Sequence, residues 1–104
     1  MSRREALIEM IEALHGEIDA LKTSDIAGLE AATTRKLRCI ETVAAHDHEP
    51  RTAEIDELAR EAHRLNETCR IYVNLMAANV RRRLQLLAGS PTPAYRRSGA
   101  AAYA

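Results

Sequence analysis

A long helical stretch from Thr52 to Ala88 constrains the fold of this 104-residue chain more than any other feature. A helix of about 37 residues would extend roughly 55 Å, at a rise of about 1.5 Å per residue. Along its first part, apolar or small residues recur in alternating steps of three and four, which is typical of helices that wrap around one another. These seam residues are Ile55, Leu58, Ala62, Leu65, Cys69, Tyr72 and Met76.

The seam changes direction after its seventh residue. The regular spacing next reaches Asn79 and Arg83, which are polar. The apolar residues shift to other positions, namely Val80, Leu84 and Leu87. Such a four-residue stutter rotates the apolar face of a helix. The long helix is therefore predicted to present two differently directed apolar faces.

Two shorter helices are predicted ahead of it, from about residue 3 to 22 and from about residue 25 to 45. Their apolar stripes are Leu7, Ile11, Leu14, Ile18 and Leu21 in the first, and Ile26, Leu29, Thr33, Leu37, Ile40 and Ala44 in the second. The run Thr23-Ser24-Asp25 between them favours a turn and a helix cap. Antiparallel pairing across this turn would bring Leu21 beside Ile26 and Leu7 near Ile40.

An alternative geometry stays open. Leu7, Ile18, Leu29 and Ile40 also recur every eleven residues, a period that one unbroken helix can sustain. The first two helices would then fuse into one arm of a long two-helix hairpin.

The loop before the long helix spans residues 46–51, because Pro50 bars helix continuation and Thr52 can open the next helix. Beyond residue 88, a Ser-Pro-Thr-Pro run and an Ala/Arg/Gly-rich end lack periodicity. We expect an all-α, antiparallel, coiled-coil-like three-helix bundle. It would form one domain over residues 1–88, with a long C-terminal helix and a flexible tail over residues 89–104.

Charge is divided along the chain although the formal net charge is zero. All fifteen acids lie in residues 1–67, against nine Lys and Arg, and residues 68–104 hold six Arg and no acid. Glu5, Glu9 and Glu12 interrupt the first apolar residues, so we expect no signal peptide. No apolar run reaches the length of about 20 residues that spans a bilayer. The sequence therefore predicts a soluble, cytoplasmic protein with no membrane insertion.

The lengths of the helices suggest a binding surface. Two helices of about 20 residues can cover only the first 20 or so residues of the third. The uncovered part keeps an apolar stripe, and such exposed patches usually mark interaction sites. The predicted partner-binding residues are Val73, Met76, Val80, Leu84 and Leu87, together with Tyr95 of the tail. The partner would be a foreign helical segment or, as the alternative, a second copy in a homodimer.

The same region carries a family resemblance. The run Leu84-Gln85-Leu86-Leu87, a short Pro-containing linker and Tyr95 resemble the C-terminal region of FlgN-type flagellar type III export chaperones. The spacing of Asp25 between Leu21 and Leu29 resembles the N-terminal pattern of that family. The resemblance implies a small cytoplasmic chaperone that binds hook-associated flagellar proteins, prevents their premature assembly and delivers them to components of the export apparatus.

Chemical sites are weakly indicated. His46 and His48 form an incomplete metal site in a loop, and Cys39 and Cys69 lack the spacing of a zinc or redox motif, so we expect small core residues there. The run from Arg81 to Arg83 comes without a nucleic-acid-binding motif. We therefore expect no enzyme, catalytic residue, cofactor, metal or nucleic-acid partner. A homo-oligomeric coiled-coil adaptor and, more remotely, a small all-helical enzyme like chorismate mutase are the alternatives.

Overall fold

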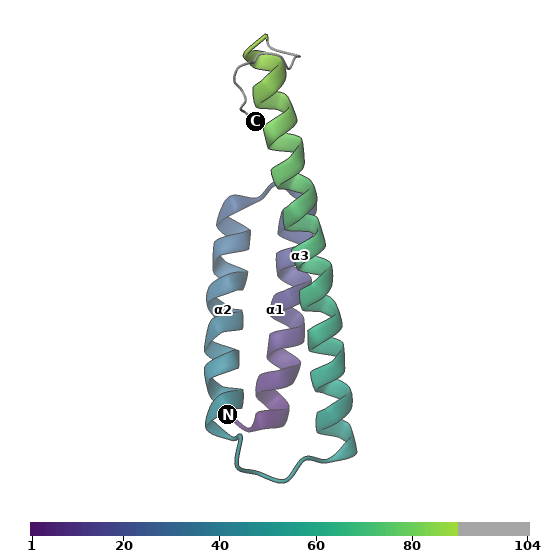
Figure 1. Ribbon diagram of the computed structural model, residues 1–104. Helices are drawn as coiled ribbons and strands as arrows, with labels where there is room; N and C mark the ends of the chain where they lie inside the picture. The colour runs from purple at the N-terminus through teal and green to yellow at the C-terminus, as the bar shows by residue number, and fades with distance from the viewer. Residues whose placement is uncertain (90–104) are drawn as a thin grey trace. The chain divides into compact units, whose positions relative to one another are not determined.

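The computed structural model describes residues 1–89, which form three α-helices. They are α1 (Arg3–Thr23), α2 (Ile26–Ala45) and α3 (Ala53–Leu87), shown in Figure 1. The all-α, antiparallel three-helix fold with a long last helix is confirmed. The fused two-helix hairpin is wrong, because α1 and α2 are separate helices. The predicted tail lies outside the described residues from residue 90 on.

The turn between α1 and α2 has a defined chemistry. Ser24 adopts the left-handed conformation, with φ of 57°, and its backbone N–H donates to the carbonyl oxygens of Ala20 and Leu21. Asp25 then caps α2 by accepting a hydrogen bond from the backbone N–H of Gly28 at 3.0 Å. A Cβ at position 28 would overlap the Asp25 carboxylate. These residues end one helix and begin the next, which is why the chain cannot continue as a single helix.

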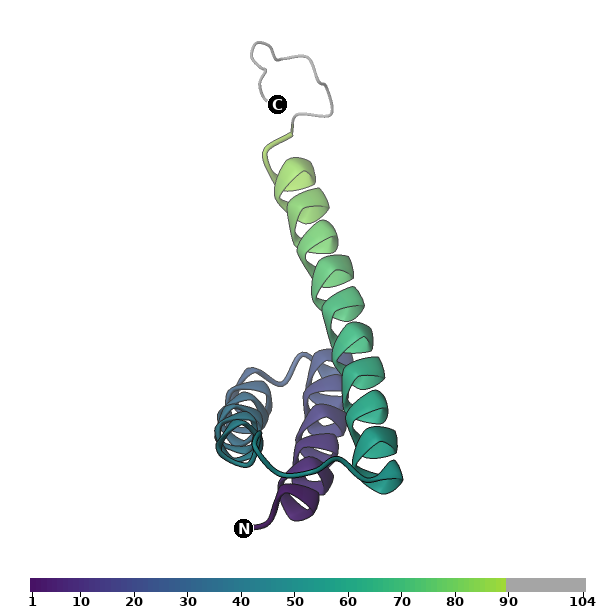
Figure 2. The same cartoon turned by 60° about the horizontal axis from the view of Figure 1, so that its bottom comes forward.

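The residues divide into two units, Met1–Val73 and the residues from Asn74 on. Within Met1–Val73, α1 is the central helix, and Figures 1 and 2 both show it with α2 on one side and the first part of α3 on the other. The Cys69 thiol of α3 donates to the Leu14 carbonyl oxygen at 3.7 Å, and Arg4 pairs with Glu54 at 2.9 Å. Arg35 of α2 forms ion pairs with two acidic residues of α1, Glu9 and Glu12.

Burial explains the central place of α1. Its large apolar residues are buried, and so are alanines spaced seven residues apart on the same helix. These two sets are Leu7, Leu14, Ile18 and Leu21, and Ala6, Ala13 and Ala20. The predicted seam of α3 joins them, with Ile55, Ala62, Leu65 and Cys69 buried and Leu58 and Tyr72 packed against the core. Burial on more than one face identifies α1 as the core helix of the bundle.

The orientation of α2 differs from the sequence prediction. Its buried residues are Ala32 and Cys39, whereas Ile26, Leu37 and Ile40 are exposed. Small side chains allow the close approach of α1 and α2, since a Cβ at Gly16 would lie 3.5 Å from the Ala32 Cβ. Close helix packing therefore favoured the small residues of α2, and Ile26, Leu37 and Ile40 remain at the surface.

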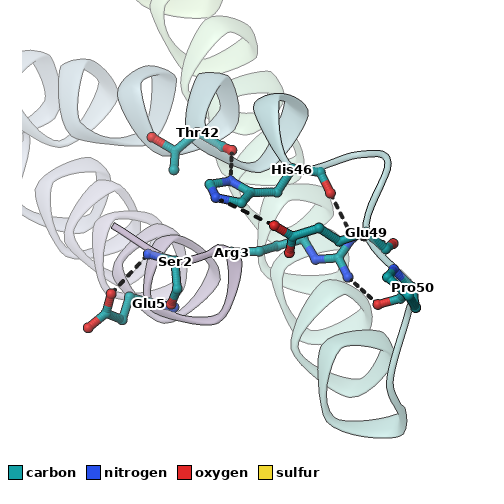
Figure 3. A network of polar contacts seen from close by, with 7 residues as sticks. All are labelled: Ser2, Arg3, Glu5, Thr42, His46, Glu49 and Pro50. Atoms are coloured by element: carbon teal, nitrogen blue, oxygen red, sulfur yellow. Dashed lines mark hydrogen bonds and ion pairs between the residues drawn. The ribbon is translucent and has the colours of Figure 1, made fainter.

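Polar contacts fix the loop between α2 and α3, as Figure 3 shows. The buried guanidinium of Arg3 donates to the carbonyl oxygens of His46 at 3.1 Å, Glu49 at 3.3 Å and Pro50 at 2.6 Å. The His46 ring contacts the Thr42 carbonyl oxygen at 2.8 Å. Arg3 thus holds the end of α2 and the approach to α3 against the first turn of α1.

A second polar group is buried between α1 and α2. The Glu17 carboxylate, 3% exposed as a residue, lies 3.1 Å from Lys36 Nζ and accepts a hydrogen bond from the Thr33 hydroxyl at 2.7 Å. Both carboxylate oxygens therefore have partners, as a buried charge requires. This arrangement places a charged pair in the middle of the α1–α2 interface.

Candidate functional site

The residues predicted to bind a partner follow one face of α3. We call Val73, Met76, Val80, Leu84 and Leu87 the C-terminal stripe, and residues Asn74–Leu87 the C-terminal segment. Val80, Leu84 and Leu87 are 52%, 60% and 84% exposed, and Val73 is also exposed. Met76 is half-buried, and Tyr95 lies outside the described residues. At about 100° per residue, these positions of the helix share one side.

The arginines of the segment surround this face asymmetrically. Helical geometry places Arg81 and Arg83 on the two flanks of the stripe and Arg82 on the opposite side. Residues 74–89 contain these three arginines and no acid. Every ion pair within residues 1–89 lies in Met1–Val73, so the three guanidinium groups have no carboxylate partner there. The segment therefore combines apolar side chains with an uncompensated positive charge.

Further apolar residues of α3 are exposed outside the stripe. Ile71, Leu75 and Leu86 are all more than half exposed, and they lie on the other side of the helix. The sequence interpretation followed only the regular seam and missed them. Asn79 and Arg82 interrupt this second set, so it is less continuous than the stripe.

A groove of about 440 Å³ opens within Met1–Val73 between α2 and α3. Leu7, Met10 and Leu14 of α1 form its floor, and Leu37 and Ile40 with Lys36 form the wall on α2. The wall on α3 is Ala59, Ala62, His63 and Asn66. The sequence interpretation did not predict this groove, because it placed Leu37 and Ile40 against α1. Their exposed fractions, 55% and 44%, follow from the orientation of α2.

The two cysteines belong to the core. Both are free and buried, which confirms the prediction of small core residues at these positions. Burial raises the pKa of the Cys39 thiol, with nearby Glu9 adding to the shift. Burial and the neighbouring Glu17 carboxylate raise the pKa of the Cys69 thiol to about 11. Because the thiolate is the reactive form, both side chains are poor nucleophiles at neutral pH.

The loop histidines and the groove offer limited chemistry. No group of three or more metal-ligating side chains occurs within residues 1–89, and His46 instead contacts Thr42 and faces Glu49. In the groove, the ammonium of Lys36 is already paired with Glu17. The groove walls are mostly apolar, which suits the packing of another apolar surface.

None of the helices, as far as residue 89, combines the length and apolar composition needed to cross a membrane. Comparisons of the chain with protein-family models, with curated proteins and with solved structures found no match.

Proposed function

We propose that this protein is a small cytoplasmic chaperone of the FlgN type. It would hold hook-associated flagellar proteins unassembled and deliver them to the flagellar type III export apparatus. The observation that carries the proposal is the exposure of the C-terminal stripe, whose large apolar side chains face solvent on a helix that begins in a packed bundle.

Exposed apolar side chains forgo stabilisation that burial would provide. Each large aliphatic residue gains roughly 1.5–3 kcal/mol when it is fully buried. Val80, Leu84 and Leu87 lie on one side over about two helical turns, so a partner helix could cover all three together. An amphipathic helix that packs lengthwise would use contacts at such spacing. Binding of this kind requires no catalytic group, and Met76 could adapt to different partner surfaces.

The class of client comes from the sequence resemblance. Proteins that assemble through helical terminal segments expose apolar helices before assembly, and a chaperone helix can cover such a segment. The arginines beside the stripe favour a client segment with an acidic edge. Tyr95 would add contact area near the end of the chain.

The experiment compares matched variants by affinity purification from the native cell, with mass spectrometry of retained proteins. Val80→Asp with Leu84→Asp alters the stripe, and Leu75→Asp with Leu86→Asp makes the same changes on the other side of α3. We expect wild type and the control to retain hook-associated proteins, and the stripe variant to lose them.

Two results would contradict the proposal. Equal retention by both double variants would show that the stripe is not the binding surface. Retention of other proteins only, with no flagellar protein among them, would reject the client class. Binding of the purified client segment should then be measured directly, with and without residues 90–104, to test the contribution of Tyr95.

A further inference from the structure

The groove between α2 and α3 is an incomplete helix-packing site. Two helices stand on either side of a floor made by α1, and the floor residues Leu7 and Leu14 are themselves almost fully buried. Leu37 and Ile40, in the wall formed by α2, are about half exposed. One more helix placed along the groove would cover these wall residues and complete a four-helix arrangement.

The length of the groove fits part of the C-terminal stripe. Its lining extends from Leu7 to Leu14 on α1 and from Ala59 to Asn66 on α3, which is about 10 Å along each helix. The interval from Val80 to Leu87 is likewise seven residues, or about 10 Å. Val80, Leu84 and Leu87 could therefore fill the groove together, and no longer helix contact is needed.

Met1–Val73 and the C-terminal segment have opposite net charges. Met1–Val73 contains fifteen Asp and Glu residues against ten Lys and Arg, and residues 74–89 contain three Arg and no acid. The exposed acids Glu30 and Glu41 of α2 form no ion pair within residues 1–89. Opposite net charges favour and accelerate association between two copies.

We propose that the groove of one copy binds the Val80–Leu84–Leu87 face of a second copy of this chain. Arg81 and Arg83 would then lie at the rim of the groove, close to the acidic bundle, while Arg82 would point away from it. Such a contact joins two different surfaces, so it can close into a dimer only if each copy contributes both. The client of the proposed function would bind the same face, so a second copy and the client would compete for it.

Sedimentation velocity of the purified full chain tests this contact. Wild type should form a dimer in the micromolar range. Leu84→Asp in the segment and Ile40→Asp in the groove should each weaken association by about tenfold or more, the factor that corresponds to about 1.4 kcal/mol. Leu86→Asp and Ile26→Asp are the controls, since both residues are exposed and lie outside the contact. Unchanged circular-dichroism melting would show that all four variants remain folded.

Mixing the two damaging variants distinguishes this contact from other dimers. The Ile40→Asp chain keeps an intact segment and the Leu84→Asp chain keeps an intact groove. Together they should form a heterodimer through one intact contact, which associates more tightly than either variant does with itself. Charge gives a finer test, because Arg83→Glu should weaken association and Arg82→Glu should affect it less.

Several outcomes would overturn the proposal. A chain that stays monomeric at all accessible concentrations would reject it. A dimer lost in Leu84→Asp but intact in Ile40→Asp would mean that two segments pack on each other. A dimer insensitive to Leu84→Asp would exclude the segment. No client is present in these measurements, so their outcome is separate from that of the affinity purification.

Discussion

The apolar stripes of α1 and of the C-terminal segment have similar spacing but opposite environments. In α1, Leu7, Leu14, Ile18 and Leu21 are buried, and Leu14 is only 1% exposed. In the segment, Val80, Leu84 and Leu87 are all more than half exposed. The spacing of residues determines which side chains share a helix face. Whether that face is covered depends on the helices available to pack on it, and α1 has two such neighbours.

The largest expected effect is on stability when a charge enters each stripe. Leu14→Asp should destabilise the fold by on the order of 5 kcal/mol, because it removes a packed side chain and buries an unpaired carboxylate. Leu84→Asp should change the unfolding free energy little, since Leu84 is largely exposed. Urea unfolding followed by circular dichroism measures both. Equal losses of unfolding free energy would mean that the two stripes are packed alike.

The buried pair of α1 and α2 should give the next largest effect. Lys36→Met leaves the Glu17 carboxylate buried without its ammonium partner, which should cost about 3 kcal/mol. Arg82→Met in the C-terminal segment is the matched control, and it should be nearly neutral. Adding Glu17→Leu to Lys36→Met should recover part of the loss in urea unfolding. If the double variant were less stable than Lys36→Met alone, the unpaired Glu17 charge would not be the cause of the stability lost in Lys36→Met.

A smaller loss is expected from the contacts at the start of α1. Arg3→Met should destabilise Met1–Val73 by about 2 kcal/mol, because three loop carbonyl oxygens lose a charged donor. Arg4→Met is the control, since the Arg4–Glu54 pair is exposed and such pairs contribute at most about 1 kcal/mol. Thermal melting compares the two variants. If Arg4→Met lowered the melting temperature as much as Arg3→Met, the loop contacts of Arg3 would not be the source of stability.

The smallest effect concerns acid. Hydrogen bonds with the backbone N–H and the hydroxyl of Ser2 hold the pKa of the Glu5 carboxyl below its ordinary value. A carboxyl whose pKa is lower in the folded state stabilises the fold above its unfolded pKa, and this contribution is lost as pH falls through the folded pKa. Glu5→Gln should therefore slightly reduce the acid sensitivity of the melting temperature below that unfolded pKa. The C-terminal segment contains no Asp or Glu, so protonation of a carboxylate cannot destabilise it in acid.

The helices could be predicted because their signals are local. Pro50 and Thr52 marked the start of α3, and Ser24 and Asp25 marked the turn after α1, where the structure shows a left-handed residue and a helix cap. In the seam from Ile55 to Cys69, Leu58 is partly buried and packs against the core, and the other seam residues are buried. Patterns of this type depend on residues within a few positions of one another.

The rotation of α2 could not be predicted in the same way. Large apolar residues suggested that Leu37 and Ile40 face α1, whereas Gly16 and Ala32 allow a close approach on a different face. Close packing of small residues depends on the partner helix, which periodicity does not describe. The groove was missed for this reason. Val73, Val80, Leu84 and Leu87 of the C-terminal stripe are exposed, and their role in binding a partner stays a prediction.

The contacts of Arg3 also bear on how the chain folds as it is synthesised. Its acceptor on Pro50 lies 47 residues further along the chain. At about 5–20 residues per second, roughly 2–10 s would separate the addition of the two residues during translation. The last residue of α2, Ala45, is added only shortly before Pro50, so α1 and α2 can begin to pair through their short turn only late in that interval, while the guanidinium still lacks its acceptors. Once the loop between α2 and α3 has been synthesised, its carbonyl oxygens can bind Arg3 of the first turn of α1. This contact would fix the position from which α3 begins to pack.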